Sequence, residues 1–183
     1  MDGVRHLGWL GTVADRAEID WDALYRQELP RVYNFFRYRF GNRTIAEDLT
    51  SVTFEKAWKA RDRYRRERAA VSTWLLAIAR NVAVDHLRRT RPEIPLDEAE
   101  AEAGARHETP ETAALRAGQH RRLWSLLAAL PAREQELLSL KYGADATNRA
   151  IASLTGLSES NVGTILHRTV TALRASWREG EAR

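Results

Sequence analysis

An acidic, proline-bearing stretch divides the chain into two parts. Residues 92–111 carry seven acidic side chains against one basic side chain, with three prolines, one glycine and no helical or strand period. Such a composition buries little apolar surface and is typical of a solvated linker. The sequence therefore predicts an N-terminal extension at 1–19, disordered by default, and domains at 20–90 and 111–178. A flexible acidic linker at 91–110 joins the domains, and a tail follows at 179–183.

Apolar residues on both sides of the linker recur at the three- and four-residue steps of amphipathic helices. They predict helices at 21–40, 44–60 and 72–89, and at about 111–130, 132–142, 148–155 and 159–177. No useful β-alternation occurs, so the predicted fold is all-α, with two small helical domains. Residues 61–71 break the period and are expected to form a loop.

Capping and turn residues mark the expected ends of these helices. The predicted N-caps are Asp20, Thr44 (in a capping box with Glu47), Ser72, Thr147 and Ser158. Gly41 and Gly143 are the predicted stops, Pro131 marks a start, and Gly156 a turn. Pro30 is expected to kink or divide the first helix. The expected core face of helix 21–40 is Trp21, Leu24, Tyr25, Leu29, Val32, Tyr33, Phe36 and Phe40, and that of helix 72–89 is Leu75, Ile78, Ala79, Val82 and Leu87.

The composition excludes several classes of function. The chain has no cysteine, so disulfide frameworks, thiolate catalysis and zinc fingers are ruled out. Its five histidines are scattered, and no clustered carboxylates or histidines suggest an enzyme, a metal site or a cofactor. No apolar run approaches the roughly 20 residues that span a bilayer, and the N-terminus lacks a signal-peptide core, which predicts a cytoplasmic protein.

The charge pattern indicates a polyanionic partner that is contacted at two places. Residues 55–91 carry eleven basic against four acidic side chains, and residues 112–183 carry ten against six. In the first segment, Trp74, Asn81, Asp85 and Arg88 lie on one stripe of the predicted helix, opposite its core face, with Arg80 and Arg89 beside them. Tyr64 lies within the arginine-rich loop, a mixture suited to single-stranded nucleic acid. The alternative is that Trp74 belongs to the core and the arginines only solvate the surface.

Residues 147–168, TNRAIASLTGLSESNVGTILHR, fit a helix-turn-helix. Ile151, Leu157, Val162 and Ile165 are expected to face the core, which leaves a polar outer face on the second helix. On that face Asn161, His167 and Arg168 can contact base edges, whereas Ser158 and Thr164 can bind phosphate. The alternative is a plain helical hairpin within a bundle.

Several strings, in this order and at this spacing, resemble bacterial RNA polymerase sigma factors of the extracytoplasmic-function (ECF) class of the sigma-70 family. They are LYRQELPRVYNFFRYRFGN, AEDLTSVTFEKAWKARDRYR, STWLLAIARNVAVDHLRR, LLAALPAREQELLSLKYG and the helix-turn-helix, and the resemblance covers about residues 20–178. It implies that helix 44–60 docks on the β′ clamp of core RNA polymerase through Asp48, Leu49 and Phe54. It also implies that residues 112–178 contact the β flap, and that the linker threads toward the active-site and RNA-exit channels.

The same resemblance implies two contacts with promoter DNA and no catalysis by the chain itself. The melted non-template strand of the minus-ten element would be held by Arg61, Arg63, Tyr64, Arg65, Arg66, Trp74, Arg80, Asn81, Asp85 and Arg88. The duplex minus-thirty-five element would be read by Ser158, Ser160, Asn161, Thr164, His167 and Arg168. Many relatives are held inactive by an anti-sigma factor, so the resemblance allows such a partner.

The chain departs from the family pattern at two places. Ser51-Val52 stands where relatives often have Gln-Glu or Gln-Asp, which shifts the clamp contact or makes it more apolar. Gly163 and Ile165 stand where the recognition helix often carries basic residues, which predicts a weaker minus-thirty-five contact. Two other functions stay open at this stage: a stand-alone helix-turn-helix regulator that acts without polymerase, and an enzyme acting on nucleic acid.

Overall fold

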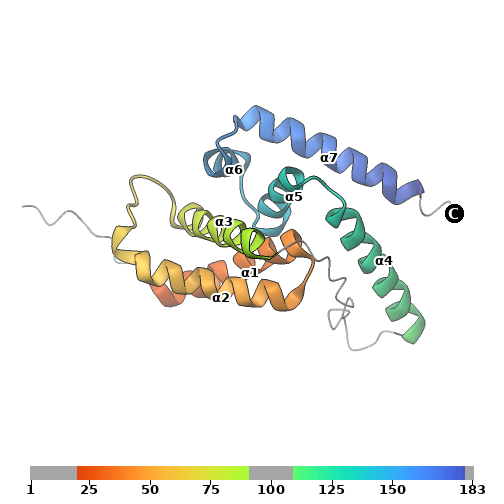
Figure 1. Ribbon diagram of the computed structural model, residues 1–183, viewed down its shortest axis with the longest axis horizontal. Helices are drawn as coiled ribbons and strands as arrows, with labels where there is room; N and C mark the ends of the chain where they lie inside the picture. The colour runs from red at the N-terminus through yellow and green to blue at the C-terminus, as the bar shows by residue number, and fades with distance from the viewer. Residues whose placement is uncertain (1–19, 91–108, 180–183) are drawn as a thin grey trace, which may run out of the picture.

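A computed structural model describes residues 20–90 and 109–179, and every regular element within these ranges is helical (Figure 1). The prediction of an all-α fold is confirmed. The N-terminal extension, most of the linker and the last four residues lie outside the described ranges. The elements in chain order are α1 (Trp21–Phe40), α2 (Arg43–Ala60), a 3₁₀ turn η1 (Arg61–Arg63), α3 (Val71–Arg89), α4 (Pro110–Ala128), α5 (Ala132–Leu138), a π-helical turn η2 (Ser139–Gly143), α6 (Asn148–Thr155) and α7 (Glu159–Glu179).

Helix α1 begins and ends where the sequence predicts. The Asp20 side chain accepts a hydrogen bond from the Ala23 amide at 3.0 Å, and Gly41 adopts a left-handed φ of 67° that ends the helix. The helix continues through Pro30, so of the two predicted effects of this proline, a kink or a division, the division does not occur.

Two predicted N-caps in the first part of the chain are wrong. The side chain of Asn42, not Thr44, caps α2 by accepting from the Ile45 amide at 2.9 Å. Both residue types cap well, and Asn42 is the one with extended backbone ahead of the helix. Helix α3 begins at Val71 after an extended Ala70 with no side-chain cap, so Ser72 lies inside the helix.

The core of the first part lies between α1, α2 and α3. Its fully buried side chains include Val32 and Phe36 of α1 and Leu75 of α3. On α3 the buried residues are Leu75, Leu76, Ala79, Val82 and Ala83. Leu87 is 45% exposed, so its predicted place in the core is wrong, because the buried face is turned toward Leu76 and Ala83.

The helix-turn-helix of the second part forms as predicted. The Thr147 hydroxyl accepts from the Ala150 amide at 3.1 Å, Gly156 turns the chain with a φ of 75°, and the Ser158 hydroxyl accepts from the Asn161 amide at 3.2 Å. Ile151 and Val162 are fully buried between α6 and α7. The predicted helix 132–142 instead changes from α-helix to a π turn at Ser139.

The two parts of the chain pack against each other. Helix α1 contacts α2 and α3 and also α5 and η2, while α6 contacts α3, and a single cluster of buried residues runs through both parts. Figure 1 shows α5 and α6 lying along the bundle of α1, α2 and α3, with α4 and α7 extending away from it. Among the described residues, no helix has the length and apolar character needed to cross a membrane.

Candidate nucleic-acid interface

The loop after α2 is closed onto the start of α3 by an aromatic pair. The Tyr64 hydroxyl donates to the Ala69 carbonyl oxygen at 3.0 Å, and its ring centroid lies 5.1 Å from that of Trp74. Both side chains are half-buried, and Trp74 packs against the core. The prediction that Trp74 lies fully exposed opposite the core is therefore wrong. The pair fixes the loop, and only part of each ring is open to a base.

The loop presents most of its arginines to solvent. Arg63, Arg65 and Arg66 are exposed, and Arg65 donates to the carbonyl oxygens of Asp62 and Tyr64 at 2.8 and 2.9 Å. These backbone bonds hold one guanidinium at the loop surface. Exposed guanidinium groups on a fixed loop are suited to neutralising phosphates.

An exposed aromatic beside this loop was missed by the sequence reasoning. Trp58 of α2, which is not among the predicted DNA-binding residues, is 50% exposed. Its ring meets that of Trp21 edge-on at a centroid distance of 5.2 Å, and the Arg61 guanidinium stacks on it at 4.4 Å. Arg61 also donates to the Trp58 carbonyl oxygen at 2.8 Å. The arginine three residues after the tryptophan was the available sequence signal.

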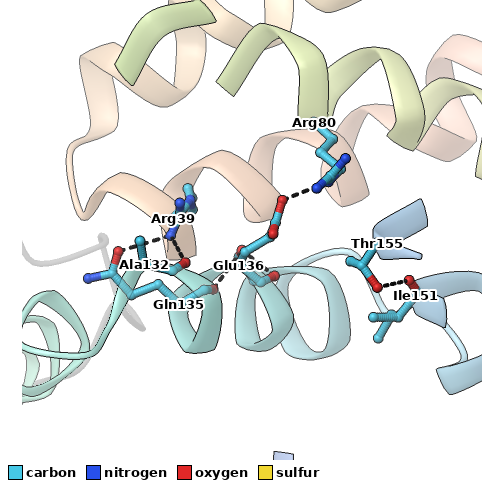
Figure 2. Close-up of polar contacts among 8 residues, drawn as sticks. Arg39, Arg80, Ala132, Gln135, Glu136, Ile151 and Thr155 are labelled. Atoms are coloured by element: carbon cyan, nitrogen blue, oxygen red, sulfur yellow. Dashed lines mark hydrogen bonds and ion pairs between the residues drawn. The ribbon is translucent and has the colours of Figure 1, made fainter. Parts of the chain in front are cut away.

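The polar side chains predicted on the outer face of α3 have different surroundings: some face solvent, and one contacts the second part of the chain. Asn81 and Arg88 are exposed. Asp85 is partly exposed and lies 3.4 Å from the Lys56 ammonium of α2. Arg80, in contrast, is half-buried and forms an ion pair with Glu136 of α5 at 2.7 Å (Figure 2). Of the four polar residues of α3 predicted to bind DNA, Asn81, Asp85 and Arg88 thus lie on one open face. The fourth, Arg80, is paired with a residue of another helix.

The predicted recognition face of α7 is open along its length. Its members Ser158, Ser160, Asn161, Thr164, His167 and Arg168 are all exposed. Arg168 lies 3.2 Å from Glu134 Oε1 of α5, and the Thr169 hydroxyl donates to Glu134 Oε2 at 3.0 Å. This carboxylate orients the arginine, whose side chain keeps 71% of its exposure.

The two positions of α7 at which this chain departs from the family pattern have different surroundings. Ile165 is half-buried and packs against the core, as predicted. Gly163 is half-buried, and a Cβ built on it would lie 3.6 Å from the Asn148 side-chain nitrogen, an ordinary contact. Packing therefore does not require glycine at this position.

Of the three residues that match the clamp-docking motif, Phe54 lines a pocket between α1 and α2. Asp48 is exposed, whereas Leu49 and Phe54 are buried. The pocket has a volume of about 360 Å³ and is lined by Tyr25, Leu29, Pro30, Tyr33, Glu47, Thr50, Ser51 and Phe54. Leu49 therefore supports this surface from within the core. No group of three or more metal-ligating side chains occurs in the described parts of the chain.

Comparisons with known proteins agree with this arrangement. The model of Sigma-70 region 2 matches residues 24–93, and that of Sigma-70, region 4 matches residues 120–173. The chain is 28% identical over 151 residues to the ECF RNA polymerase sigma factor BldN of Streptomyces coelicolor, covering 82% of this chain and 57% of that protein. It is 28% identical over 163 residues to the ECF RNA polymerase sigma factor RpoE of Cereibacter sphaeroides, covering 86% and 84%. It is 24% identical over 159 residues to the ECF RNA polymerase sigma factor SigM of Bacillus subtilis, and the match covers 87% of this chain and 96% of SigM.

Two solved structures share the fold at low sequence identity. The sigma factor RpoE in complex with the anti-sigma factor NepR from Bartonella quintana gives a TM-score of 0.67 at 18% identity, covering 87% of this chain and 97% of that one. CnrH in complex with the cytosolic domain of CnrY gives 0.65 at 20% identity, covering 90% and 92%. Models of two sigma-70 regions thus match this chain, most of which aligns with ECF relatives, and the chain belongs to the sigma-70 family as an ECF sigma factor.

Proposed function

We propose that this chain binds core RNA polymerase, directs it to specific promoters and helps to melt the minus-ten element. The observation that supports the proposal is that two separate open faces of one chain carry groups that can bind DNA. One face, on α3 and the preceding loop, has Asn81 and Arg88 beside exposed loop arginines. The other is the recognition face of α7. The corresponding units are residues 20–90 and 111–178.

The two faces suit two different states of DNA. The α3 face joins exposed guanidinium groups to the partly open aromatics Tyr64, Trp74 and Trp58, which suits a melted strand whose bases have left the stack. The α7 face presents amide, imidazole and guanidinium groups at the start of a long helix, which suits the major groove of a duplex. Each well-made base contact would contribute about 1–3 kcal/mol of discrimination.

The chain's role in this process is to bind and position DNA and polymerase. Sigma factors regulate transcription without being enzymes, and we propose that this chain likewise has no catalytic activity, metal or cofactor. A subunit of bacterial polymerase works where the chromosome is, which is the basis for proposing the cytoplasm as its location. An anti-sigma factor stays a prediction from the resemblance.

Gel filtration with core polymerase tests the proposal. The full chain is expected to co-elute with core enzyme, and the resulting complex to make run-off transcripts that core enzyme alone does not make. A stand-alone regulator would bind operator DNA as a dimer and elute separately from polymerase. Separate elution at micromolar concentrations would overturn the proposal.

Reversing the charge of Asp48 is expected to weaken binding to core polymerase by about tenfold or more. Asp48 is exposed on α2, next in the chain to the pocket-lining Glu47, and a cationic or hydrogen-bonding group of the clamp would meet it there. Loss of about 1.4 kcal/mol corresponds to that factor. Fluorescence anisotropy of labelled Asp48→Lys measures it. Asp22→Lys, an equal reversal at an exposed site in the first turn of α1, is the control, and equal affinities for the two variants would contradict the docking surface.

Replacing Arg168 with alanine is expected to lower the contribution of the upstream promoter element by about 1–3 kcal/mol. The reason is that Glu134 orients an exposed guanidinium at the recognition face. Binding of the holoenzyme to promoters with and without the upstream element gives the difference. Arg121→Ala, which removes an exposed arginine from α4, outside the recognition helix, should leave it unchanged. Unaltered promoter selection by Arg168→Ala would show that this face is wrongly assigned.

A further inference from the structure

The carboxylate of Glu134 joins the start of α5 to the recognition helix α7 at two points. Its Oε1 lies 3.2 Å from Arg168 Nη2, and its Oε2 accepts a hydrogen bond from the Thr169 hydroxyl at 3.0 Å. Arg168 is exposed and Thr169 is 2% exposed, although the two residues are adjacent in the chain. Glu134 therefore lies at the edge of the recognition face, where α7 turns from open surface to core.

Glu134 is the fixed member of this ion pair. Its side chain is 20% exposed, whereas that of Arg168 is 71% exposed. The Thr169 hydroxyl binds one carboxylate oxygen from the buried side, and the first turn of α5 is a favourable place for a negative charge. Neither of these interactions depends on Arg168. The carboxylate thus determines where the guanidinium lies, rather than the reverse.

The ion pair occupies only part of the guanidinium. Within the described residues, Nη2 is the one side-chain nitrogen of Arg168 that is bonded. A guanidinium presents its N–H donors in a planar fork, and two of them suffice for a bidentate contact with guanine O6 and N7. Arg168 can therefore stay paired with Glu134 while its remaining N–H groups contact a base in the major groove.

The carboxylate has two opposing effects on DNA binding. It restricts a long side chain that would otherwise lose its rotamer freedom on binding, which favours one defined base contact. It also cancels positive charge close to the DNA, which weakens the attraction to phosphates of any sequence. Arg168 is the one permanently charged residue among the predicted members of the recognition face, so both effects are concentrated on it.

We infer that Glu134 is a positioning residue for promoter recognition, which holds Arg168 for one base pair of the upstream element and lowers the affinity for DNA of other sequences. This inference rests on the proposed function, because it requires the α7 face to read duplex DNA. It differs from a purely structural role, in which the carboxylate only braces α5 against α7 and has no effect on which base pair is preferred.

Two variants separate the charge of Glu134 from its position. Glu134→Gln keeps an acceptor oxygen for the Thr169 hydroxyl but removes the ion pair. Thr169→Val keeps both charges but removes the hydroxyl that fixes the carboxylate, with little change in side-chain shape. Glu179→Gln is the matched control, because it removes an equal charge at the exposed far end of α7. Circular dichroism confirms that each variant is folded.

Each variant is assembled with core polymerase, and the affinity of the holoenzyme is measured for a promoter selected from a random library and for its single-base-pair substitutions in the upstream element. We expect Arg168→Ala and Glu134→Gln to lower discrimination at the same base pair by about threefold to tenfold, and Thr169→Val to lower it there by less. For DNA without the element, Glu134→Gln should bind about threefold more tightly, with a steeper salt dependence. Thr169→Val and Glu179→Gln should bind such DNA as the wild type does.

A double-mutant cycle distinguishes positioning from bracing. If Glu134 acts through Arg168, adding Glu134→Gln to Arg168→Ala should cause no further loss of discrimination. A loss spread evenly over all base pairs, an additive loss in the double variant, or discrimination that Glu134→Gln leaves unchanged or raises would overturn the inference. A wild-type holoenzyme with no preference at any position of the upstream element would instead overturn the proposed reading of that element by α7, and the inference with it.

Discussion

Combined replacement of Asn81 and Arg88 by alanine is expected to reduce open-complex formation by about 30-fold or more. Both side chains are exposed on the α3 face, beside the loop arginines. If each contributes about 1–3 kcal/mol to holding the melted strand, together they lower its free energy by at least about 2 kcal/mol. Permanganate reactivity of thymines in the minus-ten element measures the melted fraction directly.

A matched control and a pre-melted template show which step is affected. Arg26→Ala removes an exposed arginine from α1 and should leave melting unchanged. On a template with an unpaired minus-ten bubble, the double variant should still bind less tightly than the wild type, because the strand contacts themselves are missing. Wild-type melting by the double variant would contradict the assignment of the α3 face.

Replacing Phe36 with alanine is expected to lower the free energy of unfolding by about 3–5 kcal/mol. The ring is fully buried, stacks at a centroid distance of 6.3 Å on Phe40, and meets Phe35 at 5.1 Å. Leu87→Ala is the control, because Leu87 has the spacing of a core residue but is exposed, and it should change the stability by well under half as much. Urea denaturation followed by circular dichroism gives both values. Similar losses for the two variants would mean that the buried face of α3 is wrongly placed.

Local signals in the sequence were enough to place most of the helices and the helix-turn-helix. The Thr147 cap, the Gly156 turn and the Ser158 cap were all predicted, because each depends on atoms within three or four residues. One error arose where two nearby residues could serve equally well, because Asn42 caps α2 in place of Thr44.

The second buried face of α1 could not be predicted from periodicity. The pattern correctly placed Val32 and Phe36 in the core, but the neighbouring stripe, with Glu28, Arg31 and Phe35, looks mostly polar in the sequence. It is buried by α5 and η2, which lie more than 90 residues away along the chain. The helical periodicity of a sequence reports only the spacing of apolar residues. It therefore does not detect a face that is buried through hydrogen bonds and ion pairs.

The same limit applies to the candidate DNA-binding residues. Exposure of Asn81, Asn161 and His167 followed from helical geometry alone. The partners of Arg80 and Arg168 did not, because Glu136 and Glu134 are 56 and 34 residues away in the sequence. Residue types showed which groups can bind DNA, and only the packing of helices showed which of them are already engaged.

Transcription from a random promoter library by core polymerase with and without this chain tests the central claim most directly. If the chain is a promoter-specificity subunit, start sites that depend on it should share two sequence elements at a fixed spacing. The downstream element should be lost with Asn81→Ala and Arg88→Ala, and the upstream one should weaken with Arg168→Ala. Identical start sites with and without the chain would contradict the account.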